Sequence, residues 1–323
     1  MWFYATLTLV SDDHAGGRVI LAPDRRSDER LRIVGEGALA ALTAAVPRLS
    51  GHRTTRGFGR SAVVAGAIVA VLAAFWFGYP VLKDGIVAVF PPSWSDKIGR
   101  EMTADQAFFG GPCTGAAGLA ALDGLTQRLS AKAGLPEPIR VHVRSSGQVN
   151  AFASTGGHIV LLDGLIQQAE TPEEVAGVLA HEIGHVKHRH PLKRLIDVAG
   201  IQVIVSAVSG DVGAVGTTLL MLNYGRKDEA QADRTALDLM DRADIAGGGL
   251  ADFFDRMQEK HEGRPDFIPF LETHPPLGDR SAVVRGHRQN GAITPALTAK
   301  EWRALREVCV GAAKPKFNPG PER

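Results

Sequence analysis

The sequence predicts an α+β fold, mainly helical with a small β-sheet, together with one transmembrane helix. Apolar residues at helical spacing between positions 171 and 191 predict a buried helix. Segments 139–144, 150–154 and 158–162 have the composition of short strands. An uncharged run between 62 and 82 is long enough to cross a bilayer. The 323 residues are 45% hydrophobic, which supplies a sizeable core.

The uncharged run is predicted to form a single-pass membrane helix at residues 61–82. A membrane helix needs about 20 apolar residues, and most buried helices of soluble proteins are shorter. Trp76 and Tyr79, near the end of the run, suit the membrane interface. Roughly sixty residues precede the run, so it is not read as a cleavable signal peptide.

The charges on either side of the predicted span indicate its orientation. Four arginines precede it without a nearby acid: Arg48, Arg53, Arg56 and Arg60. On the other side, Lys83 and Lys97 are balanced by Asp84 and Asp96. Because positive charge stays on the cytoplasmic side, we expect the N-terminus in the cytoplasm and the larger C-terminal part outside.

The chain divides into four expected parts. Residues 1–60 are expected to form a small cytoplasmic segment, β-rich because several stretches have strand-like composition. The span 61–82 follows, and Pro91-Pro92 mark a linker into a main domain at residues 93–310. The tail 311–323 is rich in proline and charge and is predicted to be disordered.

The most specific motif is His181-Glu182-Ile183-Gly184-His185. Residues four apart on a helix lie on the same face, so both imidazoles leave that face together. Two imidazole nitrogens at this spacing suit Zn²⁺, and Glu182 can reach zinc-activated water. The pattern predicts metal ligands at His181 and His185 and a general base at Glu182. A surface helix with incidental histidines is disfavoured, because apolar residues flank the motif.

The helix that carries the motif has clear end signals. Thr171 is expected as N-cap, Pro172 at the first helical position, and Glu174 as the partner in a capping box. Pro191 is expected to end the helix. His188 and His190 are interpreted as basic residues at its C-terminal end.

A catalytic zinc site needs a third protein ligand, and Glu229 is the favoured candidate. Asp233 lies four residues later on the same helical face, where it could accept the free ring N–H of a ligating histidine. An ordinary solvated, charged helix is the alternative. Ala230, Ala232 and Ala236 favour close packing against another helix and therefore the site.

Four segments together resemble the M48 family of membrane-associated zinc metallopeptidases. They are Asn150 to Ile159, Val178 to Val186, Glu229 to Asp233, and Thr273 to Arg280. The resemblance implies a zincin-like (gluzincin) metalloprotease domain with one Zn²⁺ per chain. It implies that His181, His185 and Glu229 hold this ion and that Glu182 is the base. Thr155, Gly225 and Gln231 depart from the family pattern, but none of them is a ligand or the base.

The implied activity is hydrolysis of peptide bonds by zinc-activated water, with Glu182 as general base. His274, followed by two prolines, is the first candidate for the oxyanion donor, and Tyr224 is the alternative. The strand at Asn150, Ala151, Phe152 and Ala153 is expected to bind an extended substrate by adding a strand at its edge. It can equally be one strand of a hairpin turned by Gly156-Gly157.

The expected function is endoproteolysis of unfolded or damaged envelope proteins at the bacterial inner membrane, with the catalytic domain periplasmic. The partners would be polypeptide substrates and the lipid bilayer. A net charge of +1 gives no general attraction to nucleic acid, so none is expected. One alternative is a periplasmic holdase or assembly factor that binds extended segments, with proteolysis secondary. Another is a processing protease with one dedicated membrane substrate.

Two further features remain open in the sequence. Cys113 and Cys309 lack the spacing of a metal pair, so either a disulfide in an oxidising compartment or two unrelated buried thiols would account for them. The apolar stretch 198–222 is split by Gly210 and Asp211 into pieces too short to span a bilayer. It predicts a helical hairpin that is either packed in the core or dipped into the membrane surface.

Overall fold

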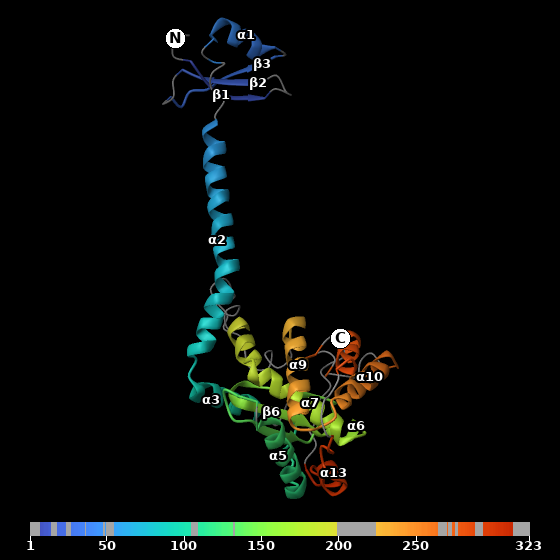
Figure 1. Cartoon of the computed structure of the whole chain (residues 1–323). Coiled ribbons are helices and arrows are strands. Elements are labelled where there is room, and N and C mark those ends of the chain that lie inside the picture. The colour runs from blue at the N-terminus through green and yellow to red at the C-terminus, as the bar shows by residue number, and fades with distance from the viewer. Residues whose placement is uncertain are drawn as a thin grey trace. The chain divides into compact units, whose positions relative to one another are not determined.

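The computed structural model divides the chain into two compact units, Met1–Tyr79 and Pro80–Arg323, which are described separately (Figure 1). The residues that it describes are 7–13, 18–23, 27–35, 37–47, 49, 55–104, 109–131, 133–198, 224–263, 270, 273–274, 277–287 and 293–312. The predicted hairpin at 198–222 lies outside this set apart from Val198, and so does the predicted tail from residue 313 onward.

The first unit contains a three-stranded antiparallel sheet in the order β1-β2-β3. The strands are β1 (Thr8–Asp13), β2 (Arg18–Ala22) and β3 (Leu31–Val34), and helix α1 (Ala38–Ala45) contacts β2. Val19 and Leu21 of β2 form a small core with Val46 and Leu49. Stretches of strand-like composition in this segment do form strands within its described residues.

The apolar run lies in helix α2 (Thr55–Val89), which is longer than the predicted span. Of the described helices, α2 alone is long and apolar enough to cross a membrane, over Val63–Val89. The sequence estimate stopped at Leu82 because Lys83 and Asp84 interrupt the uncharged run. Backbone hydrogen bonding does not depend on that charge, so the helix continues to the Pro91-Pro92 pair.

The sheet of the second unit has the order β4-β6-β5. Its strands are β4 (Arg140–Arg144), β5 (Ala151–Ala153) and β6 (His158–Leu162). β4 runs parallel to β6, whereas β5 is antiparallel to β6 and connected to it by a short 3-10 turn, Thr155–Gly157. The predicted strands and the predicted hairpin are therefore confirmed, and β5 lies at an edge of this sheet.

Helices of the second unit pack around this sheet, and one of them is central. They are α3 (Pro92–Thr103), α5 (Ala116–Ser130), α6 (Asp163–Gln168), α7 (Pro172–Lys187), α9 (Arg226–Arg242), α10 (Gly248–Gly263), α12 (Leu277–Arg285) and α13 (Ala299–Arg306). The central helix, α7, packs against α9, α10 and β5 (Figure 1). All its residues from Glu174 to Val186 are buried. This helix is therefore a rigid support for the polar side chains of the motif at 181–185.

Both ends of α7 differ from the sequence prediction. Thr171 is the N-cap and Pro172 is at the first position, but the Thr171 side chain makes no capping bond. The capping box is wrong because Glu174 instead accepts from the Glu170 N–H and pairs with Arg256. α7 ends at Lys187, after which Arg189 adopts a positive φ of 53° and a new helix covers 190–198. Pro191 therefore lies in the first turn of that next helix.

The helix at 190–198 is fastened to the end of α2. Lys83 Nζ lies 3.0 Å from Asp197 Oδ1, and Lys193 Nζ lies 3.6 Å from Asp84 Oδ1. One turn further along α2, the Arg189 guanidinium donates to the Val87 carbonyl over 2.7 Å. Since higher numbers in 189–197 meet lower numbers in 83–87, the two helices run antiparallel here.

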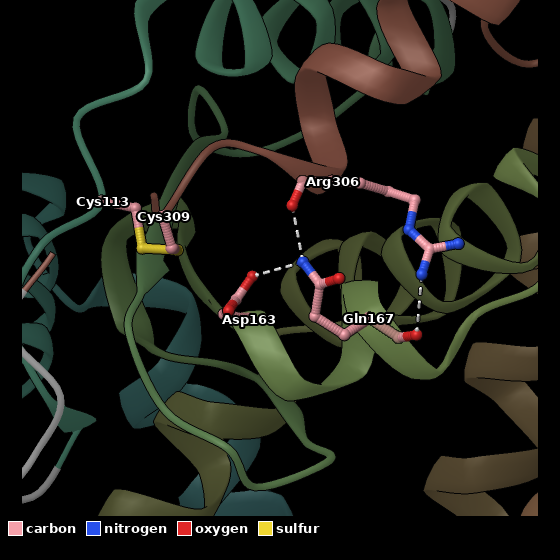
Figure 2. The surroundings of a disulfide bond; sticks show 5 residues. All are labelled: Cys113, Asp163, Gln167, Arg306 and Cys309. Atoms are coloured by element: carbon pink, nitrogen blue, oxygen red, sulfur yellow. Dashed lines mark hydrogen bonds between the residues drawn. A yellow bond between two sulfur atoms is a disulfide. The ribbon is translucent and has the colours of Figure 1, made fainter. Parts of the chain in front are cut away.

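A disulfide joins Cys113, just before α5, to Cys309, just after α13 (Figure 2). The two cysteines are 196 residues apart in sequence. Next to the bridge, the Gln167 amide donates to the Arg306 carbonyl, and Arg306 donates to the Gln167 carbonyl (Figure 2). These contacts hold the C-terminal helix against α5 and α6.

Candidate metal centre

Three side chains from two helices meet in the core of the second unit. His181 and His185 of α7 face each other with 3.0 Å between their Nε2 atoms. Glu229 of α9 lies 3.6 Å from each of these nitrogens, through Oε2 to His181 and Oε1 to His185. All three side chains are buried. The residues predicted to hold a metal are therefore brought to one point.

The separations suit a small tetrahedral cation. Metal–ligand distances of about 2.0–2.2 Å for zinc put the ligand atoms of a tetrahedron about 3.4 Å apart. The observed separations of 3.0, 3.6 and 3.6 Å lie around this value. The residues present therefore fit the metal that the sequence motif implies.

The hydrogen bonds behind the two imidazoles fix their tautomers. His181 Nδ1 lies 2.9 Å from Asp233 Oδ1, and a carboxylate only accepts, so Nδ1 carries the proton and Nε2 a lone pair. His190 Nε2 faces the Gln231 carbonyl oxygen at 3.1 Å and donates to it. The other nitrogen of His190 then accepts from His185 Nδ1, over 2.9 Å.

Both Nε2 atoms thus point lone pairs at each other across 3.0 Å. Two lone pairs repel, and a cation between them turns that repulsion into attraction. Burial also holds the pKa of His185 well below its ordinary value, which keeps its imidazole neutral. This arrangement is the observation in the structure that most directly points to a bound metal ion.

His190 corrects one sequence interpretation. It was expected to be a basic residue at the helix end, but it is buried and links His185 to Gln231. Burial lowers the pKa of His190, so it is not a surface cation. Neither this role of His190 nor that of Gln231 could be predicted from the sequence. The hydrogen bonds that join them to His185 depend on the turn at Arg189, which brings His190 back toward α7.

Glu182 lies beside the donor cluster, fully buried within α7. Within the described residues neither carboxylate oxygen makes a hydrogen bond of standard geometry, although the Ala153 backbone N–H and His274 Nε2, the latter at 3.5 Å, face it. Burial raises the pKa of Glu182, while the nearby His274 and His181 lower it, and the net shift is upward. A buried carboxylate with unmet hydrogen bonds and a raised pKa is suited to accepting a proton from a reactant.

His274 adds a fourth donor, the third nitrogen, to the cluster. Its Nδ1 lies 3.1 Å from Glu229 Oε1 and 3.4 Å from His181 Nε2, and its Nε2 lies 3.5 Å from Glu182 Oε1. One donor atom from each of His181, His185, Glu229 and His274 falls within 4.8 Å of the others. Its geometry allows His274 to bind a metal or to donate to a reacting oxygen.

Tyr224, the alternative donor, lies next to the cluster. Its ring stacks on His185 with 3.9 Å between centroids. Its backbone N–H donates to the Thr273 carbonyl, next to His274. Burial raises the pKa of Tyr224 well above its ordinary value, so the phenol keeps its proton.

Arg280 of α12 ties the surrounding carboxylates together. Its guanidinium binds Asp233 through two bonds of 2.7 Å and lies 2.5 Å from Glu229 Oε2. It also donates to the His274 carbonyl over 3.1 Å. Burial by itself raises the pKa of Asp233, but the bonds from Arg280 and His181 hold this pKa well below its usual range. Sequence analysis named Arg280 only as part of a motif and missed this role.

The predicted substrate strand β5 ends at this cluster. Leu162 N–H donates to the Asn150 carbonyl and Ser154 N–H to the His158 carbonyl, so residues 150 and 154 direct their backbone groups toward β6. By the alternation of an antiparallel strand, Ala151 and Ala153 direct theirs to the free edge. The Ala151 N–H is capped by its neighbour's side chain, Asn150 Oδ1, at 2.9 Å.

Known proteins share this part of the chain. The β-barrel assembly-enhancing protease of Escherichia coli (strain K12) is 27% identical over 169 residues, which is 46% of this chain and 34% of that protein. Metalloprotease LoiP from the same organism is 29% identical over 160 residues, 46% of this chain and 62% of LoiP. The mitochondrial metalloendopeptidase OMA1 of Schizosaccharomyces pombe (strain 972 / ATCC 24843) is 27% identical over 142 residues.

In each of these cases the alignment spans less than two thirds of the relative's own length. The family model described as "Peptidase family M48" matches residues 119–288, which is more than half of the chain and includes all four clustered donors. The chain therefore belongs to peptidase family M48.

Proposed function

We propose that the chain is a membrane-anchored zinc endopeptidase in which His181, His185 and Glu229 bind one Zn²⁺. The single observation that carries this proposal is the pair of buried lone pairs facing each other beside a carboxylate. When bound, zinc would activate a water molecule and polarise the peptide carbonyl. Asp233, through His181 Nδ1, and His190, through His185 Nδ1, keep both ligands in the required tautomer.

Glu182 is the proposed general base. Its carboxylate stands next to the donor cluster and is faced by the Ala153 N–H and His274 Nε2 without a hydrogen bond of standard geometry to either, so it can take the proton of the attacking water and return it to the leaving amine. His274 is the proposed donor to the developing oxyanion, because its Nε2 is buried, lacks a described hydrogen-bond partner, and lies 3.5 Å from Glu182.

The substrate would lie along β5. The Ala153 N–H faces Glu182, whereas the Ala153 carbonyl points away from β6 and can accept from the backbone of an extended peptide, which would bind with little regard to its side-chain sequence. Such binding needs a locally unfolded segment. This supports the proposal that the substrates are unfolded or damaged envelope proteins, and the relatives named for β-barrel assembly support an envelope role for this chain.

For the location, we propose the bacterial inner membrane, with the N-terminal segment in the cytoplasm and the catalytic unit in the periplasm. The arginines before α2 favour this orientation. The disulfide between Cys113 and Cys309 also supports it, because such bonds persist in oxidising compartments. Added protease should degrade the catalytic unit on spheroplasts, and protection of this unit until lysis would contradict the proposed orientation.

The central test is the Glu182→Gln variant of the full chain. We expect zinc content to stay at one ion per chain, while casein cleavage falls by roughly 10²–10⁴-fold because the proton acceptor is lost. Glu259→Gln, on the exposed side of α10, is the matched control and should keep full activity. Undiminished cleavage by the Glu182→Gln variant would exclude Glu182 as the base.

The same variant also tests the alternative that the protein is a holdase or assembly factor. The free edge of β5 favours this reading, because strand addition can hold a segment without cleaving it. If Glu182→Gln prevents aggregation of an unfolded protein as well as the wild type does, and the wild type barely cleaves it, holding is the main activity. Trapping of intact substrate only by the variant would instead support proteolysis.

A further inference from the structure

A pocket opens beside the donor cluster at the free edge of β5. Its empty volume is about 490 Å³, part of which is open solvent. β5 contributes Phe152 and Ala153 to its lining, and the helix at 190–198 contributes Pro191, Arg194 and Leu195. The lining thus comes in part from the proposed substrate strand and in part from the segment that follows the metal helix.

The position of the pocket relates it to the reacting bond. Its lining includes His274, whose Nε2 faces Glu182, and Tyr224, whose ring stacks on His185. A peptide paired with Ala153 would carry its scissile carbonyl to this cluster. Since successive side chains of an extended strand leave on opposite sides, a residue next to that carbonyl would direct its side chain into the pocket.

The chemistry of the lining indicates what the pocket accepts. Met102, Phe152, Leu195 and the ring of Tyr224 are large and apolar. Arg194 is the one permanently charged residue among the described lining residues, and its guanidinium carbon lies 5.5 Å from the centroid of the Tyr224 ring. An apolar side chain would be desolvated by these walls, while an incoming lysine or arginine would meet a like charge.

We propose that this pocket selects the substrate residue on one side of the scissile bond, accepting large apolar side chains and rejecting basic ones through Arg194. Leu195 and Met102 set the size of the residue that fits, and Arg194 sets its charge. The protease would then cut where buried core residues of a protein have become exposed. This inference rests on the proposed function, since it assumes cleavage at the Glu182 cluster.

The test uses the full chain in detergent micelles with its metal, and fluorogenic peptides that differ only at the two residues flanking the cleaved bond. At one of these positions, leucine or phenylalanine should be preferred over alanine by roughly 10–200-fold in kcat/KM. Lysine at that position should be cleaved more slowly than alanine. Mass spectrometry of the products confirms that the same bond is cut in every peptide.

Two variants assign the selectivity to the pocket. Arg194→Met removes the charge at similar length and should raise lysine cleavage relative to leucine by about tenfold or more, whereas Arg194→Lys retains the charge and should not. Leu195→Trp fills the pocket and should shift the preference from phenylalanine toward alanine. Thermal unfolding of each variant checks that the fold is kept.

Unchanged peptide ratios in both folded variants would overturn the pocket assignment. Because one variant tests charge and the other tests size, the loss of one variant to misfolding leaves the other decisive. The outcome is distinct from failure of the proposed function itself, which would show as no cleavage of any peptide by the wild type or as equal cleavage by Glu182→Gln.

Discussion

Arg280 shows how much of the proposed metal centre depends on residues that are not proposed as ligands. One guanidinium satisfies Asp233, lies against Glu229, and holds the backbone of His274. Its charge is almost fully buried, and the Phe254 ring lies 4.6 Å from its central carbon. A buried charge that neutralises two carboxylates in this way fixes the orientation of the ligands they support.

We therefore predict that Arg280→Lys weakens zinc binding by roughly 10–100-fold, because lysine cannot make the two parallel bonds to Asp233. Competition with a fluorescent chelator measures the affinity. Arg242→Lys is the matched control: Arg242 makes a surface pair with Asp238 on the same helix as Asp233, and its loss should leave zinc affinity unchanged. Equal affinities in all three proteins would show that Arg280 does not position the ligands.

A second residue-scale prediction concerns His142 on β4. His142 Nε2 lies 2.8 Å from His158 Nδ1, and the arginines Arg140 and Arg144 are its charged neighbours. Burial, with these neighbours, lowers the pKa of His142 to about 4. Since the unfolded chain binds this proton below about pH 6.5 and the folded chain only near pH 4, stability should fall as the pH falls through this window.

The His142→Gln variant should show a shallower loss of stability between pH 6.5 and pH 4. Chemical denaturation at a series of pH values measures this slope. His287→Gln, at an exposed histidine outside this cluster, is the control. It should keep the wild-type dependence of stability on pH between pH 6.5 and pH 4. A slope for His142→Gln that equals the wild type would mean that His142 does not take part in acid destabilisation.

At the scale of elements, α3 is docked on the turn that ends β5. Ser95 accepts from Thr155 and Gly156, and Asp96 accepts from His158. The two backbones are in direct contact at Gly99, where an added Cβ would lie 1.9 Å from the Thr155 carbonyl oxygen. The position of the proposed substrate strand is therefore set by the helix that follows the membrane anchor.

Gly99→Ala should displace this turn and raise the KM for an extended peptide several-fold with less effect on kcat, because β5 moves while Glu182 does not. Steady-state kinetics measures both constants. Gly124→Ala in α5, where an added Cβ meets nothing within 4 Å, is the control and should be neutral or stabilising by roughly 0.5–1 kcal/mol. Identical kinetics for both variants would separate α3 from substrate binding.

Elements and site differ in how well the sequence predicted them. Strand composition and helical periodicity report local preferences, and they located β4, β5, β6 and the body of α7. The capping box and the end of α7 were wrong, because the partner of Glu174 is Arg256, which is 82 residues away. The sequence predicted that His181 shares a helix face with His185, and Glu229 with Asp233. It could do so because the two members of each pair are four residues apart on one helix.

At the scale of the whole molecule, the disulfide joins the two ends of the catalytic unit. Cys113 and Cys309 are separated by 196 residues, so the bond restricts most of this unit in the unfolded chain. We predict that replacing both cysteines with serine lowers the free energy of unfolding by roughly 2–5 kcal/mol. Denaturation with and without a reductant measures the effect, and the double variant, unlike the wild type, should not respond to the reductant.

The fastening of the helix at 190–198 to the last turns of α2 has a consequence for where cleavage can happen. Lys83 with Asp197, and Asp84 with Lys193, brace that helix, and α7 precedes it by only a two-residue turn. The proposed active site is therefore held to the end of α2 and is not connected to it by a flexible linker. With α2 as the proposed membrane span, these contacts keep the proposed active site close to the C-terminal end of that span, so a substrate must come to the membrane surface to be cut.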